Sequence, residues 1–343
     1  MNHRTRVLLA VGVTVVLFLG VQFGALALIE PFHESERQAV ENPDDPTNSV
    51  VYFAIILVAT AFMLVTFKYD VEWLIKALII GVSVMLAWFV FAELVPPVAT
   101  VGSVNAIAAL GAIAVGAGLL FYPEWYVIDS TGVIMGAGAA ALFGISFGLL
   151  PAILLLAVLA VYDAISVYRT EHMLDLAEGV MDLKIPVVLV IPTSLSFSYL
   201  ESGSTDDVLD DDTDSSAGET ESTSDSPAAG ESGVNAETDD QDTDAIERDA
   251  LFIGLGDAVI PTILVASAAY FLDVGLIAVP GIALNVPALG AIIGTIAGLL
   301  VLMHMVLKGK PHAGLPLLNG GAISGYLLGA VASGLSLATA LGL

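Results

Sequence analysis

The sequence predicts an all-α polytopic membrane protein with nine transmembrane helices, and three observations predict it. Hydrophobic residues make up 57% of the 343 residues and charged residues only 13%, whereas soluble domains are about 45–50% apolar and about 25% charged. The apolar residues gather in runs of the roughly 20 residues that a helix needs to cross a bilayer. The basic residues fall almost entirely on one side of the topology that these runs define.

Nine apolar runs define the predicted spans. The first follows Met1-Asn2-His3-Arg4-Thr5-Arg6, and it is too long for the apolar core of a signal peptide, so it is predicted to be a retained signal-anchor helix. A tight turn at residues 148–151 separates the fifth and sixth spans, and Pro151 suits the first turn of a new helix. The predicted spans are residues 7–29, 49–67, 73–95, 101–121, 128–147, 149–168, 250–272, 283–306 and 314–341.

The orientation follows from the basic residues. With nine spans and a cytoplasmic N-terminus, the outside receives only Arg37, and the C-terminus lies outside. This asymmetry is a strong positive-inside signal, and it predicts a multi-pass protein of the cell membrane. The residues on the cytoplasmic side are Arg4, Arg6, Lys68, Lys76, Arg169, Lys184, Arg248, Lys308 and Lys310.

Residues 201–249 form a segment of a different kind. They contain 18 of the 36 acidic residues and one basic residue, Arg248, and such a composition does not bury enough apolar surface to fold. The segment is predicted to be a disordered cytoplasmic loop, a spacer or a docking tail. It divides the chain into residues 1–200, with six spans and a β-prone tail, and residues 250–343, with three spans. The acidity also fits a halophilic archaeal cytoplasm, and the net charge of -26 argues against nucleic-acid binding.

A short apolar segment, Met181 to Pro192, lies between the sixth span and the acidic loop. It is too short to span a membrane, and its β-branched residues favour a strand. Pro186 and Pro192 confine that strand to the edge of a sheet. An exposed edge at residues 187–191 would capture an extended peptide by strand addition; packing against the helix ends is the alternative.

Two aspartates, Asp163 and Asp257, lie within predicted spans, where a carboxylate is costly and functional by default. Asp163 precedes Arg169 by six residues, which places it about 9 Å inside the cytoplasmic boundary at the rise of a helix. Asp257 lies about seven residues into the seventh span, at a depth of about 10 Å. Because the two spans are antiparallel neighbours, the sequence predicts that the two carboxylates meet at one level.

Two neighbouring carboxylates cannot both ionise cheaply, so the pair is expected to share one proton. Aspartic proteases use this arrangement, in which one carboxylate activates water and the other protonates the substrate carbonyl. Gly254 and Gly256, on either side of Leu255, allow the backbone to loosen or a substrate strand to approach closely. The alternatives are a structural role for each acid, and ordinary small-residue packing for the glycines.

Tyr162-Asp163 in the sixth span and Gly254-Leu255-Gly256-Asp257 in the seventh resemble the motifs of the presenilin and signal peptide peptidase family, the Gly-x-Gly-Asp intramembrane aspartyl proteases. The long hydrophilic loop between these spans also matches, and the likeness covers essentially the whole chain, closest to archaeal presenilin homologues. The resemblance implies a nine-helix fold, cleavage of substrate transmembrane helices, and no metal or organic cofactor, and the predicted orientation places the active site toward the cytoplasmic side. Substrate identity and a homo-oligomeric state stay open.

The family has a third motif, Pro-Ala-Leu, which opens its ninth span and helps to position substrate. Pro287-Ala288-Leu289 matches it letter for letter but opens the predicted eighth span on the outer side, far in depth from both aspartates. The equivalent position follows Lys308-Gly309-Lys310, and the role is therefore carried to Pro316, Leu317 and Leu318, where leucine replaces alanine in the middle.

Other enzyme classes and a transporter are the competing interpretations. Gly144-Ile145-Ser146-Phe147-Gly148 matches a serine-hydrolase string, but the elbow needs a histidine base, and His304 lies at the opposite depth. No His-Glu-x-x-His zinc motif is present, and the chain has no cysteine. A proton-coupled transporter or channel also uses intramembrane acids, and it remains the alternative. Three further polar residues are predicted to be interfacial, namely Glu93, Asn105 and Asp129.

Overall fold

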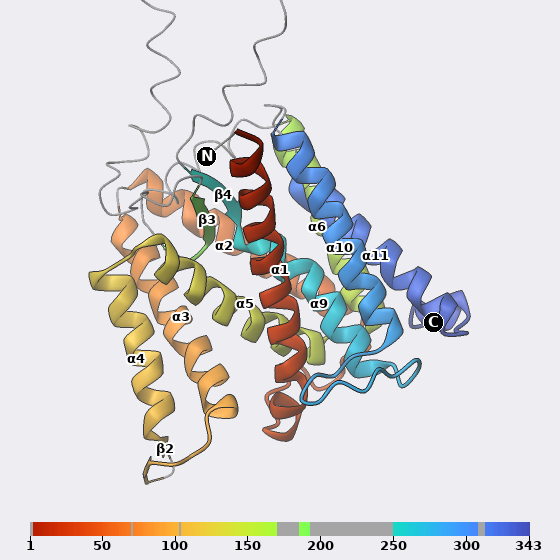
Figure 1. Cartoon of the computed structure of the whole chain (residues 1–343), viewed down its shortest axis with the longest axis horizontal. Helices are drawn as coiled ribbons and strands as arrows, with labels where there is room; N and C mark the ends of the chain where they lie inside the picture. The colour runs from red at the N-terminus through yellow and green to blue at the C-terminus, as the bar shows by residue number, and fades with distance from the viewer. Residues whose placement is uncertain (1–2, 70, 103, 170–184, 193–249, 308–312) are drawn as a thin grey trace, which may run out of the picture.

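The computed structural model describes residues 3–69, 71–102, 104–169, 185–192, 250–307 and 313–343. These ranges hold helices and two short antiparallel sheets, β1–β2 and β3–β4 (Figure 1). The helices are α1 (His3–Glu34), α2 (Thr47–Lys68), α3 (Glu72–Leu94), α4 (Ala106–Phe121), α5 (Trp125–Ser146), α6 (Leu149–Arg169), α9 (Leu255–Phe271), α10 (Val286–Val306), α11 (Gly314–Ala332) and α12 (Leu337–Ala340). The strands are β1 (Thr100–Val101), β2 (Val104–Asn105), β3 (Val188–Pro192) and β4 (Ala250–Gly254).

Within the described ranges, seven helices are long and apolar enough to cross a membrane: α1, α2, α3, α5, α6, α10 and α11. Two further apolar helices, α4 and α9, have 16 and 17 residues. The prediction of a helical membrane protein with many spans is confirmed. The number of nine spans and the sides on which the termini lie remain predictions.

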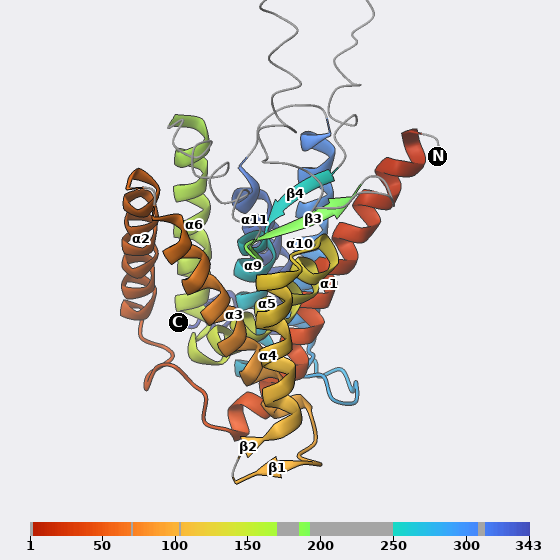
Figure 2. The same ribbon diagram turned by 90° about the vertical axis from the view of Figure 1, so that its left-hand side faces the viewer.

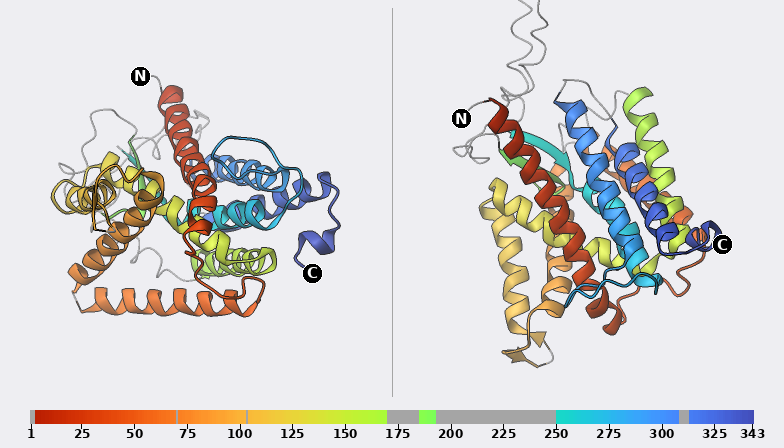
Figure 3. Two further views of the ribbon diagram at one scale, coloured as in Figure 1. Left: turned by 90° about the horizontal axis from the view of Figure 1, so that it is seen from below. Right: turned by 45° about the vertical axis from the view of Figure 1, so that its right-hand side comes forward.

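The helices are arranged around three central ones, α1, α5 and α9, which pack against one another. On one side α10 and α11 form the most extensive helix pair, and α6 packs against α11. On the other side α3 and α4 pack together, and α2 lies at the periphery beside α6 and α3 (Figures 2 and 3). The antiparallel pair of strands β3 and β4, which are distant in sequence and are called the β3–β4 hairpin below, lies at the end of the molecule where α1 begins, above the start of α9 (Figure 2).

Two predicted spans begin five residues too early. The seventh span, predicted from residue 250, begins as the strand β4, and α9 starts only at Leu255. The fourth, predicted from residue 101, begins at Ala106 after the β1–β2 turn, where the Asn105 side chain caps α4 by accepting hydrogen bonds from two main-chain N–H groups. The sequence does not predict β4, because its main-chain groups are hydrogen-bonded to β3, a distant segment that no local pattern identifies.

The tight turn predicted at residues 148–151 agrees with the structure, whereas the predicted end of the ninth span does not. α5 ends at Ser146 and α6 begins at Leu149 with Pro151 in its first turn, so the turn between them is as short as expected. The ninth predicted span is shorter than expected, because α11 ends at Ala332 and a separate short helix, α12, follows.

Glycines determine how closely α10 and α11 approach. A Cβ atom added at Gly290, Gly294 or Gly298 of α10 would collide with main-chain atoms of α11. Small residues on facing helix surfaces allow this close backbone approach in membranes. The N-terminal end of α11, which reaches the two aspartates, is therefore held by a rigid helix pair.

Candidate active site

Asp163 lies near the C-terminal end of α6 with its side chain buried, 8% exposed. Its Oδ2 atom accepts a hydrogen bond of 3.0 Å from the main-chain N–H of Leu315, which belongs to the first turn of α11. The first N–H groups of a helix have no partner within the helix, and they carry partial positive charge. The start of α11 therefore supplies both a hydrogen bond and a favourable field to this carboxylate.

Asp257 is the third residue of α9, whose N-cap is Gly254. Its side chain is half-buried and lies against the start of α11, since a Cβ atom placed on Gly314 would be 3.1 Å from Asp257 Oδ2. The prediction that Asp257 lies seven residues into a helix is wrong, because the five residues before α9 belong to β4, whereas its depth in the membrane stays a prediction. An acidic residue in the first turn is favoured by the helix dipole.

The structure brings the two aspartates together at one place. Consecutive residues of α11 touch both of them, Gly314 beside Asp257 and Leu315 bonded to Asp163. The two carboxyl groups are also close enough to interact electrostatically. Three separate segments, the end of α6, the start of α9 and the start of α11, thus form one paired-carboxylate site.

The β3–β4 hairpin adjoins this site. Its strands pair antiparallel from Val188 opposite Gly254 to Pro192 opposite Ala250, and the Leu255 N–H donates to the Val187 carbonyl at 2.7 Å. Because Asp257 follows the last residue of β4 by three positions, the hairpin and the carboxylate are mechanically connected. The strand predicted in the segment ending at Pro192 is confirmed for Val188–Pro192, whereas residues 181–184 lie outside the described residues.

The free edge expected on β3 is not available for peptide capture. Leu189, Val190 and Ile191 are buried, and the N–H of Val190 donates to Asp129 Oδ1 at 2.8 Å. The prediction of an exposed edge at residues 187–191 is wrong, because β3 is enclosed between β4 on one side and α5 on the other.

The other residues predicted for the site take different positions. The ring of Tyr162 is half-buried and packs edge-to-face on Phe53 of α2, with ring centroids 5.9 Å apart. Leu255 is buried against α5, whereas the two motif glycines, Gly254 and Gly256, are exposed.

The segment Pro316-Leu317-Leu318 starts one residue after Leu315, in the first turns of α11. Leu318 is fully buried, and the Leu317 carbonyl faces Gly298 of α10. Pro287 instead packs near Gly329, which is 15 residues along α11 from Gly314, or about 22 Å at the helical rise. The literal Pro-Ala-Leu match therefore lies far from the paired carboxylates.

Sequence reasoning missed three residues that contact the site or its hairpin. Leu315 acts through its main-chain N–H, a group that its residue type does not reveal. Gly314 acts by having no side chain, so that Asp257 lies close to it. Asp129 carried a signal, since it is an acid within an apolar run. Its interfacial position stays a prediction, and what the sequence does not show is that its side chain is only 4% exposed and bonds to β3.

The sequence and the fold both match known proteins. The family model for signal-peptide peptidase, presenilin aspartyl protease, matches residues 15–335. The chain belongs to this family of intramembrane aspartyl proteases.

Two solved structures of a presenilin family intramembrane aspartate protease, in different crystal forms, are similar to it. One is 30% identical with a TM-score of 0.60, covering 94% of this chain and 99% of the other. The second is 31% identical with a TM-score of 0.57, covering 93% and 96%. Among curated protein sequences there is no match.

The serine-hydrolase string belongs to a different part of the fold. Ser146 is fully buried at the C-terminal end of α5, where its hydroxyl donates to the Leu142 carbonyl and accepts from the Ala39 N–H. His304 lies in the last turn of α10, the end that adjoins the start of α11. Membership of the aspartyl protease family and this separation together exclude a Ser146–His304 dyad.

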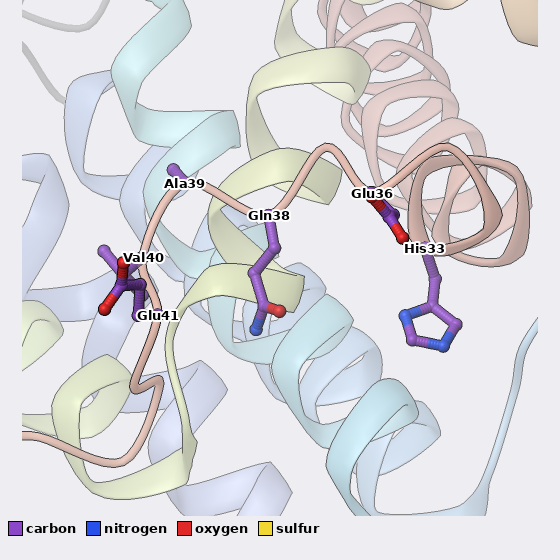
Figure 4. A pocket seen from close by; sticks show the side chains of 6 residues that line it. All are labelled: His33, Glu36, Gln38, Ala39, Val40 and Glu41. Carbon is purple, nitrogen blue, oxygen red and sulfur yellow. The ribbon is translucent and has the colours of Figure 1, made fainter.

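A cavity of about 330 Å³ lies in the loop that follows α1, lined by His33, Glu36, Gln38, Ala39, Val40 and Glu41 (Figure 4). His33 is hydrogen-bonded to Tyr270, which is 13 residues along α9 from Asp257, or about 20 Å at the helical rise. This cavity is therefore at the opposite end of the molecule from the paired carboxylates.

Proposed function

We propose that this chain is an intramembrane endopeptidase that hydrolyses peptide bonds within or near the transmembrane helices of membrane-protein substrates, with Asp163 and Asp257 as its catalytic pair. The observation that carries the proposal is the convergence of the two carboxyl groups at the start of α11, through Leu315 and Gly314. The Gly-x-Gly-Asp motif at residues 254–257 and family membership support it.

The paired carboxyl groups supply general base and general acid together. One ionised carboxylate removes a proton from water, and the resulting oxygen attacks the peptide carbonyl carbon. The protonated partner donates its proton to the carbonyl oxygen, giving a tetrahedral diol. When the diol collapses and the C–N bond breaks, one carboxyl group gives a proton to the nitrogen and the other carboxylate removes a proton from a diol hydroxyl, so the pair again shares one proton. The pair titrates as a unit, so the roles of base and acid are not divided between Asp163 and Asp257 individually.

A transmembrane substrate must unwind locally, because an intact helix holds its carbonyl groups in hydrogen bonds. The β3–β4 hairpin supports this step, since an extended substrate segment adds to a sheet edge by main-chain hydrogen bonds. Because Asp129 and α5 enclose the outer edge of β3, we place the substrate along the other edge, on β4. The exposed Gly254 at the end of β4 allows close approach beside Asp257.

The start of α11 is the second surface that we assign to the substrate. Pro316, Leu317 and Leu318 follow the two residues that touch the aspartates, and Pro316 and Leu317 are half-buried. The positive-inside pattern supports a cytoplasmic position for this end of the helices. We therefore propose that cleavage occurs close to the cytoplasmic face of the cell membrane, on partners that are transmembrane proteins or peptides.

Cleavage of a single-span reporter peptide in detergent by the purified chain tests this function directly. We expect the wild-type protein to cut the reporter within or next to its apolar segment, and mass spectrometry of the products to locate the bond. Asp257→Ala, prepared in parallel, is expected to be inactive. Cutting of the same bond by both proteins would remove Asp257 from the mechanism and contradict the proposal. Cutting by neither, while proteoliposomes show proton-coupled flux, would favour the transporter instead.

The missing side chain at Gly314 is expected to matter for catalysis. A Cβ atom at this position would lie 3.1 Å from Asp257 Oδ2 and 3.4 Å from its Cγ, so Gly314→Val displaces the carboxylate. Because small misplacements of reacting groups are costly, we expect kcat to fall about tenfold or more. The matched control is Gly320→Val on the same helix, where a new Cβ meets nothing within 4 Å. Equal activities of the two variants would show that Gly314 does not constrain Asp257.

A further inference from the structure

Asp129 is a buried acid that the proposed chemistry does not use. It lies in the second turn of α5, within a helix apolar enough to cross a membrane, and only 4% of it is exposed. A carboxylate in such a place is costly unless it is hydrogen-bonded or otherwise compensated. The side chain of Asp129 therefore needs a hydrogen-bonding partner within the fold.

That group is the main chain of β3. Asp129 Oδ1 accepts a hydrogen bond of 2.8 Å from the N–H of Val190, in the middle of the strand. In an antiparallel pair, successive residues direct their main-chain groups alternately toward the partner and away from it. The carbonyl of Val187 bonds to Leu255 on the β4 side, so the main chain of Val190 faces the opposite side, away from β4. Asp129 thus takes the place that a third strand would occupy.

The face of α5 that carries Asp129 is shaped to receive the hairpin. Gly132 and Gly136 lie three and seven residues later and hence on the same face. A Cβ atom at Gly132 would be 3.2 Å from Leu189 Cδ2 and 3.6 Å from Leu255 Cδ1. One residue of β3 and the first residue of α9 therefore rest on this glycine. Together, the hydrogen bond from Val190 and the contacts at Gly132 hold the hairpin and the start of α9 against α5.

We propose that Asp129 is a positioning residue for proteolysis, whose carboxylate holds β3 through Val190 and thereby determines where the hairpin presents a substrate peptide bond to the paired aspartates. The inference rests on the proposed function, because it assigns the hairpin to the substrate. The connection is short: β3 pairs along its whole length with β4, and β4 ends three residues before Asp257.

Two substitutions at one position separate the acceptor oxygen from the bulk of the side chain. Asp129→Asn keeps an oxygen that accepts from Val190, whereas Asp129→Ala removes it. With the reporter peptide, we expect Asp129→Ala to lower kcat about tenfold, which corresponds to about 1.4 kcal/mol, with KM changed far less. We also expect its products to spread over neighbouring bonds. Asp129→Asn is expected to retain the wild-type cleavage position and to restore most of kcat.

Hydrogen–deuterium exchange gives a readout that does not depend on proteolysis. In Asp129→Ala the amide protons of residues 185–192 are expected to exchange faster than in the wild type, and in Asp129→Asn at nearly the wild-type rate. If exchange follows this pattern while no protein cuts the reporter, the hydrogen bond stands and the proposed function fails. If the wild type cuts and Asp129→Ala cuts at the same bond with the same kcat, the positioning role is overturned.

Equal losses of kcat in Asp129→Ala and Asp129→Asn would also overturn the proposal, because charge and not the acceptor oxygen would then be responsible. If Asp129→Ala does not fold, Val190→Pro decides the question, since it removes the donor and leaves Asp129 in place. The N–H of Val190 faces away from β4, so the substitution leaves the β3–β4 ladder intact. A shifted cleavage position in Val190→Pro supports the proposal, and the wild-type position at the wild-type rate overturns it.

Discussion

Asp163→Asn and Asp257→Asn are each expected to lower the rate of reporter cleavage by roughly 1,000-fold or more. Each variant leaves one carboxyl group beside an amide of the same shape, and an amide neither accepts the proton of the attacking water nor donates one to the carbonyl oxygen. When two catalytic residues act as a unit, the enzyme loses nearly all of its activity if either residue is removed. The measurement is single-turnover cleavage with the purified protein in saturating excess over the reporter.

The fold is expected to survive both substitutions. In Asp163→Asn the side-chain amide oxygen would still accept the hydrogen bond from Leu315, and removing one of two neighbouring acids relieves their repulsion. The melting temperatures in detergent should therefore equal or exceed that of the wild type. The control is Asp273→Asn, which makes the same chemical change at an exposed residue after α9, with unchanged activity expected. Appreciable cleavage by either active-site variant would remove that aspartate from the mechanism.

Gly294→Leu is expected to prevent folding, or to lower the melting temperature by about 10 °C or more. A side chain at this position would run into the main-chain carbonyl of Gly321 on α11, and a backbone atom cannot rotate away. The two helices would have to separate, which would remove their closest contacts and displace the start of α11 from both aspartates. Thermal unfolding in detergent and the yield of monodisperse protein measure the effect.

The matched control for this substitution is Gly320→Leu, on the face of α11 where a new Cβ meets nothing within 4 Å. This variant is expected to fold and melt like the wild type, since it adds an apolar side chain to an exposed position. Similar melting temperatures for Gly294→Leu and Gly320→Leu would show that the α10–α11 contact tolerates separation. That result would also contradict a rigid placement of Gly314 and Leu315 at the site.

The sequence determined the class of the protein because the hydrophobic effect acts on composition and length, which are readable residue by residue. Runs of about 20 apolar residues identified the helices, and the cost of a charge in lipid singled out Asp163 and Asp257. The two motifs around these acids identified the family, which the family model confirms. These inferences needed no knowledge of which segments touch.

The tertiary structure decided what depends on contacts between distant segments. Residues 250–254 are as apolar as a helix end, and only their pairing with β3 makes them a strand. Leu315 reaches Asp163 across 152 positions of the chain through a main-chain N–H, a group that every residue except proline carries. Asp129 reaches Val190 across 61 positions. Residue type does not tell which main-chain N–H will bond to a distant carboxylate or which glycine will face a close contact, so these roles emerge only once the helices and the hairpin are packed.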